Sequence, residues 1–215
     1  MNSYIDAYCE RLSPGLWAEP LNAVSNAAFL IAALAAYLLA RRRGVVDGDS
    51  VLLLALLTAI GIGSTLFHTF AVRWAALADS LPILLFQIAY LAVYGRQVIG
   101  LRPLWVLALV GAYFAVTVLC GLLPGHWLNG SLSYLPALLF LGGLAVYHAR
   151  RHKHARWMLA ASTTLFTVSL TFRSLDMAVC NVLPIGVHYM WHILNGCVLY
   201  GVLVALFMNK PQRAG

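Results

Sequence analysis

Three histidines and a serine stand out because they lie in stretches that are otherwise apolar enough to enter a membrane. The segment "GVHYMWHILNG" places His188 and His192 four residues apart, and "GSTLFHTF" places Ser64 four residues before His68. Residues four apart lie on one face of a helix, so the two members of each pair are expected to point the same way. Polar rings inside a membrane are costly unless they bind something, which makes these positions candidates for a functional site.

Asp79 joins this group because "DSLP" opens the next apolar stretch of the chain. If the stretch that ends at His68 runs outward and those that begin at Asp79 and His188 run inward, these residues lie at one depth. Three histidines with one open coordination position are typical of catalytic zinc, which lowers the pKa of its bound water to about 7. Asp79 would then hold or deprotonate that water, and Ser64 would donate a hydrogen bond to a developing oxyanion.

Each of these residues also has an ordinary structural explanation. Asp79 with Pro82 shortly after it is typical of a helix N-cap. Ser64 could simply pack between membrane helices, and His68 alone could be a hydrogen-bonded core residue. The combination favours a metal site, because a histidine pair, a third histidine and a carboxylate are all expected at the same depth.

The elements that must position these residues are membrane-spanning helices. The chain has 215 residues, of which 62% are hydrophobic and 10% charged, whereas soluble domains carry about 25% charged residues. Seven apolar stretches approach the roughly 20 residues that a spanning helix needs. These predicted stretches are 22–40, 51–70, 79–98, 104–123, 132–147, 158–175 and 187–208. The sequence therefore predicts an all-α membrane protein that folds as one seven-transmembrane-helix bundle.

The positive charges predict how this bundle is oriented. Most of the 14 Lys and Arg residues lie on one side, for example in "RRRG" after the first stretch and "RRHKHAR" after the fifth. The exceptions are Arg11, Arg73 and Arg173. Because cytoplasmic loops are rich in Lys and Arg, the N-terminus is predicted outside and the C-terminus in the cytoplasm. Residues 1–21 would form an extracytoplasmic segment, 22–208 the transmembrane domain and 209–215 a cytoplasmic tail.

The charge and the cysteines indicate the surroundings of the protein. The net charge of +7 mostly reflects this topology, so it does not indicate a nucleic-acid partner. Cys9 and Cys180 both fall on the outer side, where disulfides are permitted, but the residues alone leave open whether they pair. The small size and short loops are typical of a bacterial plasma-membrane protein; a eukaryotic chain of this kind would lie in an endomembrane. The sequence does not indicate an oligomeric state.

Four pieces of the sequence follow one another in a recognisable order. They are "YCERL…WAEPLNAVSN" around residues 9–26, "SxxxH" at Ser64–His68 followed by Asp79, the looser "FRSLDMAVC" at 172–180, and "HYMWH" at His188–His192. Together they resemble the alkaline ceramidase family, within the wider superfamily of seven-helix membrane hydrolases that includes the adiponectin-receptor-like proteins. The likeness covers nearly the whole chain, and the ordered set is far more specific than any one piece.

The resemblance implies a zinc-dependent amidase that cleaves the fatty-acyl amide of ceramide-type lipids. The zinc ligands that it implies are His68, His188 and His192. The catalytic residues that it implies are Ser64 and Asp79. It also implies a disulfide between Cys9 and Cys180.

The resemblance further implies a Ca²⁺ site, because animal members of the family bind calcium near the zinc through acids of the N-terminal segment. Glu10 and Glu19 match that pattern. The chain departs from it at Asp6, which is displaced by one residue, and at Leu12, which stands where an amide-bearing ligand is expected. Without a metal, Glu10 and Glu19 would be solvated or interfacial charges at the start of the first helix.

The leading hypothesis is the hydrolysis of a ceramide-like amide to a fatty acid and a sphingoid-type amine. A zinc hydrolase of another N-acyl or ester lipid, and a non-enzymatic seven-helix receptor with a structural metal, are the alternatives. A retinal-binding pigment is excluded, because the only lysines, Lys153 and Lys210, lie in segments predicted to be cytoplasmic. An adiponectin-receptor-like protein would have the opposite topology.

Overall fold

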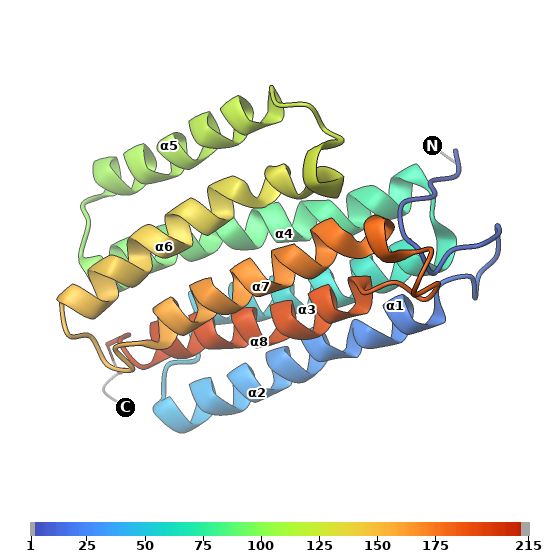
Figure 1. Ribbon diagram of the computed structural model, residues 1–215. Helices are drawn as coiled ribbons and strands as arrows, with labels where there is room; N and C mark the ends of the chain where they lie inside the picture. The colour runs from blue at the N-terminus through green and yellow to red at the C-terminus, as the bar shows by residue number, and fades with distance from the viewer. Residues whose placement is uncertain (1–2, 212–215) are drawn as a thin grey trace.

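The computed structural model describes residues 3–211, and its helices form one elongated bundle (Figure 1). The helices are α1 (Pro20–Ser25), α2 (Ala27–Arg43), α3 (Gly48–Phe70), α4 (Arg73–Tyr94), η1 (Gly95–Ile99), α5 (Pro103–Gly121), η2 (Trp127–Tyr134), α6 (Leu135–Arg150), α7 (Met158–Val179) and α8 (His188–Phe207). Each of the seven predicted stretches falls on helices of this set. The all-α prediction is therefore confirmed.

Six helical segments within the described residues are long and apolar enough to cross a membrane. They are Pro20–Arg43, Gly48–Phe70, Arg73–Ile99, Pro103–Gly121, Trp127–Arg150 and His188–Phe207. The first joins α1 to α2 across Asn26, and the third and fifth add η1 to α4 and η2 to α6. Helix α7 has 22 residues but is not among these six, and its sequence carries several Ser and Thr residues together with Arg173 and Asp176.

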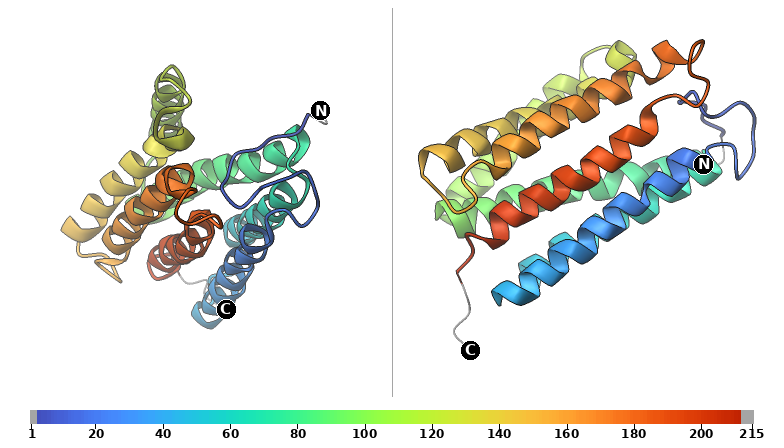
Figure 2. Two further views of the ribbon diagram at one scale, coloured as in Figure 1. Left: turned by 45° about the vertical axis from the view of Figure 1, so that its right-hand side comes forward. Right: turned by 60° about the horizontal axis from the view of Figure 1, so that its bottom comes forward.

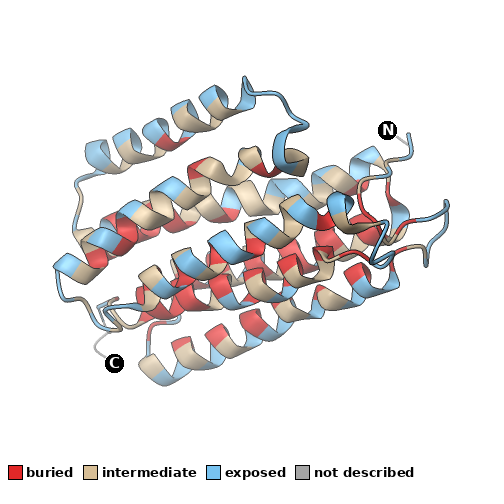
Figure 3. Cartoon of the chain, viewed as in Figure 1, coloured by how far each residue is buried: buried red, intermediate tan, exposed pale blue. Residues whose placement is uncertain are grey.

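Helix α8 lies at the centre of the bundle. It packs against α7 on one side and α2 on the other, while α3 packs against both α2 and α4. Figures 1 and 2 show α5 at one edge, and Tyr113 is its only buried residue. The buried residues gather on the faces that the helices turn toward one another (Figure 3). The apolar outer faces, such as that of α5, are suited to contact lipid.

The prediction that Asp79 begins a helix is wrong. Helix α4 begins at Arg73, so that only Ala71 and Val72 separate it from α3, and Pro82 lies inside the helix. The pattern of Asp79 followed by Pro82 predicts a first turn, because proline is over-represented at the start of helices. Here Pro82 only removes the N–H that would bond to the Ala78 carbonyl, and the helix continues through it. Asp79 is consequently a mid-helix side chain and not an N-cap.

The N-terminal segment closes one end of the bundle. The backbone of Ile5 donates to the Ala71 carbonyl at 2.8 Å, and a disulfide joins Cys9 to Cys180 beyond the end of α7. Helix α8 begins at this same end and finishes at the opposite one (Figure 1). The segment is therefore fixed against the tips of α3, α4, α7 and α8, where the candidate residues lie.

Candidate metal centre

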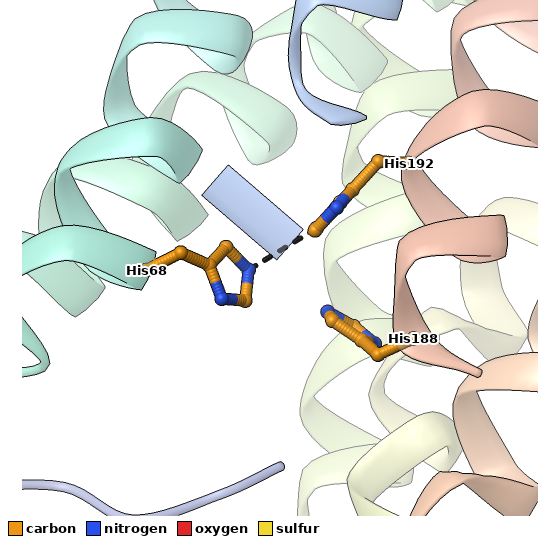
Figure 4. A group of neighbouring side chains, drawn as sticks. All are labelled: His68, His188 and His192. Carbon is orange, nitrogen blue, oxygen red and sulfur yellow. Dashed lines mark hydrogen bonds between the residues drawn. The ribbon is translucent and has the colours of Figure 1, made fainter. Parts of the chain in front are cut away.

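The three histidines predicted as ligands meet at the end of the bundle covered by the N-terminal segment. His68 is on the last turns of α3, and His188 and His192 are on the first two turns of α8 (Figure 4). One nitrogen of each ring lies within 4.8 Å of the others. All three rings are buried, with at most 2% of each residue exposed. The cluster is thus the arrangement that the shared depth and the i, i+4 spacing predicted.

Hydrogen bonds fix which nitrogen of His192 faces the cluster. Its Nδ1 lies 2.7 Å from the Ser25 hydroxyl, and that hydroxyl donates its hydrogen to the Asn22 carbonyl at 2.9 Å. Because a hydroxyl has one hydrogen, Ser25 must accept from Nδ1–H of His192. The other nitrogen, Nε2, is then left with a free lone pair.

Glu19 orients His68 in the same way. The Glu19 carboxylate lies 2.5 Å from Nδ1 of His68 and is also bound by Arg11 and Asn22. Burial acts to raise the pKa of Glu19, but the hydrogen bonds from His68, Arg11 and Asn22 outweigh it and hold that pKa below its usual value. An ionised Glu19 accepts from Nδ1–H, which again leaves Nε2 as the free nitrogen.

The two free nitrogens point at each other. Nε2 of His68 and Nε2 of His192 are 3.1 Å apart (Figure 4). With both rings neutral, the facing lone pairs repel unless a proton or a cation lies between them. A buried carboxylate or hydroxyl on the outer nitrogen and a lone pair on the inner one is the usual condition of a metal-binding histidine.

His188 completes the donor set. Its ring stacks on Tyr8, with centroids 3.6 Å apart, and its Nδ1 is buried with no hydrogen-bond partner among residues 3–211. One nitrogen of this ring belongs to the group within 4.8 Å, so all three rings offer a donor to one ion. Three imidazole nitrogens are donors that zinc prefers, whereas calcium and magnesium take oxygen ligands. The residues present therefore fit a zinc ion.

Asp176 places His188 at the cluster. The Asp176 carboxylate accepts the N–H groups of Val187 at 2.7 Å and His188 at 2.9 Å, which caps the start of α8. The same carboxylate accepts the N–H of Cys9 at 3.0 Å, next to the disulfide. One buried side chain thus sets the first turn of α8 and the path of the N-terminal segment together.

Ser64 and Asp79 face each other where α3 and α4 approach closely. A Cβ on Gly63 would stand 1.9 Å from the Ala78 carbonyl oxygen, so only glycine allows this contact. The residues that follow, Ser64 and Asp79, are thereby brought close to each other across this contact. Ser64 lies one helical turn before His68 in α3, and Asp79 lies in the first two turns of α4. Both predicted catalytic residues therefore come from the same end of the bundle as the histidines.

The two acids implied as calcium ligands, Glu10 and Glu19, each bind other groups of the protein. Glu10 accepts the backbone N–H groups of Leu21 and Asn22 at 2.6 and 2.8 Å, which caps α1. Glu19 is bound to Arg11 and His68, as described above. Among the described residues, the three histidines are the only group of three or more His, Cys, Asp or Glu side chains gathered for one ion. The Glu10 and Glu19 surroundings therefore do not fit a calcium ion.

Sequence reasoning missed four residues around the centre, namely Tyr8, Arg11, Arg173 and Asp176. Arg173 is near Asp79 and Tyr8, and its guanidinium stacks 5.2 Å from the Tyr134 ring. Tyr8 and Arg11 lie in the irregular N-terminal segment, where no periodic pattern indicates a direction, and Arg173 and Asp176 lie in the last two turns of α7. Their one sequence signal was their place inside the motifs "YCERL" and "FRSLDMAVC".

An apolar pocket lies inside the bundle near the histidine cluster. Its walls include Phe29, Ile83, Tyr134, Phe166, Trp191 and Asn195. Phe29 meets the His192 ring edge-on at 6.2 Å, and Trp191 precedes His192 in α8. The pocket therefore adjoins the histidine cluster through Phe29 and is bounded mainly by aromatic and aliphatic side chains.

Comparisons with known proteins identify the family of the chain. A search of curated proteins gave no match. A family model described as Ceramidase matches residues 2–213, nearly the whole chain, and the matched range includes every residue of the histidine cluster. The earlier resemblance is confirmed, and the chain belongs to the ceramidase family.

Proposed function

We propose that this protein is a zinc-dependent intramembrane hydrolase that cleaves the acyl amide of ceramide-like lipids to a fatty acid and a sphingoid-type amine. Membership of the ceramidase family implies amide-bond hydrolysis. The observation that carries the metal is the pair of Nε2 atoms facing each other at 3.1 Å, each with its outer nitrogen engaged. His68, His188 and His192 would hold the zinc.

The remaining residues supply the acid–base and electrostatic chemistry. Zinc in a three-histidine site supplies Lewis-acid activation of water and of the amide carbonyl. Asp79 accepts the proton of the attacking water and passes it to the leaving amine nitrogen. Ser64 donates its hydroxyl hydrogen to the carbonyl oxygen as negative charge develops there. Both side chains come from the α3–α4 contact, so one close approach of two helices sets the geometry of both.

The apolar pocket is suited to hold the acyl chain. Its aromatic and aliphatic walls would bury a hydrocarbon tail, while the amide at the tail's head lies at the histidines. Asn195 is a polar group in the wall and lies one helical turn beyond His192. Such a site receives a lipid whose scissile bond lies just below the headgroups, which matches the position of the centre near one end of the bundle.

The membrane topology follows from the same fold. We place α7 in the membrane as a seventh span, because it is 22 residues long and packs between α6 and α8. An odd number of crossings puts the two ends of the chain on opposite sides of the membrane. The Lys- and Arg-rich loops then favour residues 1–21 and the metal centre on the outer side and residues 209–215 in the cytoplasm. The bundle of residues 22–208 is then the whole catalytic domain, in a plasma membrane or an endomembrane.

The first experiment separates catalysis from metal binding. Ser64→Ala and Asp79→Asn are each expected to keep about one zinc per chain and to lose at least about 100-fold in hydrolysis, because each removes one catalytic group and no ligand. Zinc is measured by elemental analysis of the purified protein, and hydrolysis on a panel of ceramides, other N-acyl lipids and lipid esters. His188→Ala is expected to lose both zinc and hydrolysis.

The same panel decides between the alternatives. If the protein cleaves esters or other N-acyl lipids in preference to ceramide, the proposed substrate is wrong, whereas the proposed zinc mechanism still holds. Full hydrolysis by both Ser64→Ala and Asp79→Asn would refute the assigned roles. A zinc-loaded protein that cleaves no member of the panel would favour a receptor with a structural metal.

A further inference from the structure

We propose that the guanidinium of Arg11 takes the place of a calcium ion beside the metal centre, so that this protein organises its N-terminal segment without calcium. The resemblance to animal ceramidases implied calcium on the acids of this segment. The structure instead places an internal cation there. Arg11 is 3% exposed, and its contacts are all within the segment and the end of α3.

The acceptors around Arg11 are oxygens of the kind that bind calcium. Its Nε donates to the Glu19 carboxylate, its Nη2 to the His68 carbonyl at 2.7 Å, and its Nη1 to the Gly15 carbonyl at 3.3 Å. Calcium takes six to eight carboxylate, carbonyl and water oxygens at about 2.3–2.6 Å. One carboxylate and two carbonyls converging on one point would begin such a site, and here the guanidinium occupies that point.

Charge and ligand count also exclude a calcium ion next to Arg11. The remaining acid, Glu10, caps the start of α1 through Leu21 and Asn22, so neither of its oxygens is directed at Glu19. Leu12 is 83% exposed and has no donor oxygen in its side chain. A divalent cation added there would share the single charge of Glu19 with a buried guanidinium, and the two cations would repel each other.

Arg11 is thereby a positioning residue for the zinc ligand His68. It neutralises Glu19, which in turn accepts Nδ1–H of His68, and it holds the His68 backbone carbonyl directly. Groups that orient a metal-binding histidine typically contribute 10- to 100-fold to metal affinity. This step rests on the proposed zinc function, whereas the replacement of calcium does not.

The first test is a calcium titration of the zinc-loaded wild-type protein. Buffers are depleted of calcium with a chelating resin, because a soluble chelator would compete for zinc, and CaCl₂ is added to about 1 mM with MgCl₂ as the control. We expect no difference between the two salts in the thermal unfolding temperature or in calcium binding by calorimetry. A saturable rise of the unfolding temperature with CaCl₂ alone would overturn the proposal.

The second test changes the internal cation. Arg11→Glu replaces it with a carboxylate among oxygen acceptors, and its unfolding temperature is expected to rise with CaCl₂ but not with MgCl₂. An unfolding temperature of Arg11→Glu that does not change when CaCl₂ is added would count against the proposal.

The third test measures the link to His68. Arg11→Met is expected to weaken zinc binding at least about tenfold, while Arg102→Met, at an exposed arginine before α5, leaves it unchanged. Wild-type zinc affinity in Arg11→Met would show that Arg11 does not position the ligand. None of these measurements uses a lipid, so they stand apart from the choice of substrate.

Discussion

At the level of single residues, the direction of one hydrogen bond determines the chemistry of His192. The Ser25 hydroxyl gives its only hydrogen to Asn22 and so must accept from Nδ1 of His192. Without the Ser25 hydroxyl, the neutral His192 ring could carry its hydrogen on either nitrogen. In the tautomer with the hydrogen on Nε2, no lone pair would face His68. A small polar residue on a different helix thus fixes the tautomer that a metal needs.

Ser25→Ala is therefore expected to weaken zinc binding about 10- to 100-fold while the chain still folds. Ser25→Thr keeps a hydroxyl and is expected to bind zinc within a few-fold of wild type. Zinc affinity is measured by competition with a chromophoric chelator. Ser80→Ala is the control, because the Ser80 hydroxyl bonds only to the Ala76 carbonyl of its own helix. Equal zinc affinity in Ser25→Ala and Ser80→Ala would contradict the tautomer argument.

At the level of elements, the close contact between α3 and α4 sets the catalytic pair. Pro82 cannot donate to the Ala78 carbonyl, and Gly63 lies against that same carbonyl with no side chain to keep the helices apart. The proline and the glycine thus both affect the surroundings of the Ala78 carbonyl oxygen. Ser64 and Asp79, which follow Gly63 and Ala78, consequently come within reach of each other.

Gly63→Ala is expected to destabilise the bundle by about 1–3 kcal/mol and to lower hydrolysis, because its Cβ would stand 1.9 Å from a backbone oxygen that cannot rotate away. Gly111→Ala, in α5, has no atom within 4 Å of the added Cβ and is expected to be neutral or slightly stabilising. Thermal unfolding in detergent and hydrolysis by each variant test this. Hydrolysis at the wild-type level in Gly63→Ala would show that the catalytic pair does not depend on the contact.

The sequence predicted the parts of this site that lie on regular helices. The spacing of Ser64 with His68 and of His188 with His192 indicates a shared face wherever the helix exists, and the alternation of outward and inward spans indicates their depth. It could not predict Asp176 or Tyr8 as partners of His188, because they act from the end of a helix and from a segment without periodicity. The start of α4 was misplaced because Pro82 is compatible with both a first turn and a helix interior.

At the level of the whole molecule, the two ends of the bundle are closed by different means. At the metal end, a disulfide and the Asp176 carboxylate fasten the N-terminal segment to α8. At the opposite end, Lys210 lies 2.6 Å from the Asp47 carboxylate and 2.9 Å from the Ser50 hydroxyl. This ion pair joins the residues after α8 to the start of α3. Lys210, the second residue of the predicted cytoplasmic tail 209–215, is 4% exposed and packs against the bundle.

This end of the bundle is expected to be sensitive to acid in a defined direction. Burial acts to raise the pKa of Asp47, but the hydrogen bonds from Lys210 and Ser50 outweigh it and lower that pKa below its usual value. A carboxyl whose pKa is lowered by folding stabilises the folded state at any pH above its unfolded value, about 3.9. That stabilisation is lost as the pH falls below about 4 and through the lower folded value, where the native carboxyl is protonated as well.

Asp47→Asn is accordingly expected to unfold at a lower temperature than wild type near pH 7, with a difference that shrinks as the pH is lowered below about 4. Lys210→Met removes the other partner and is expected to show the same convergence with wild type, because a protonated Asp47 no longer needs the cation. Comparing variants at each pH cancels the protonation of all other groups, including the histidines. The measurement is the unfolding temperature of the three proteins across this pH range. A gap between wild type and Asp47→Asn that stays constant down to about pH 3 would mean that the pair contributes through packing and not through charge.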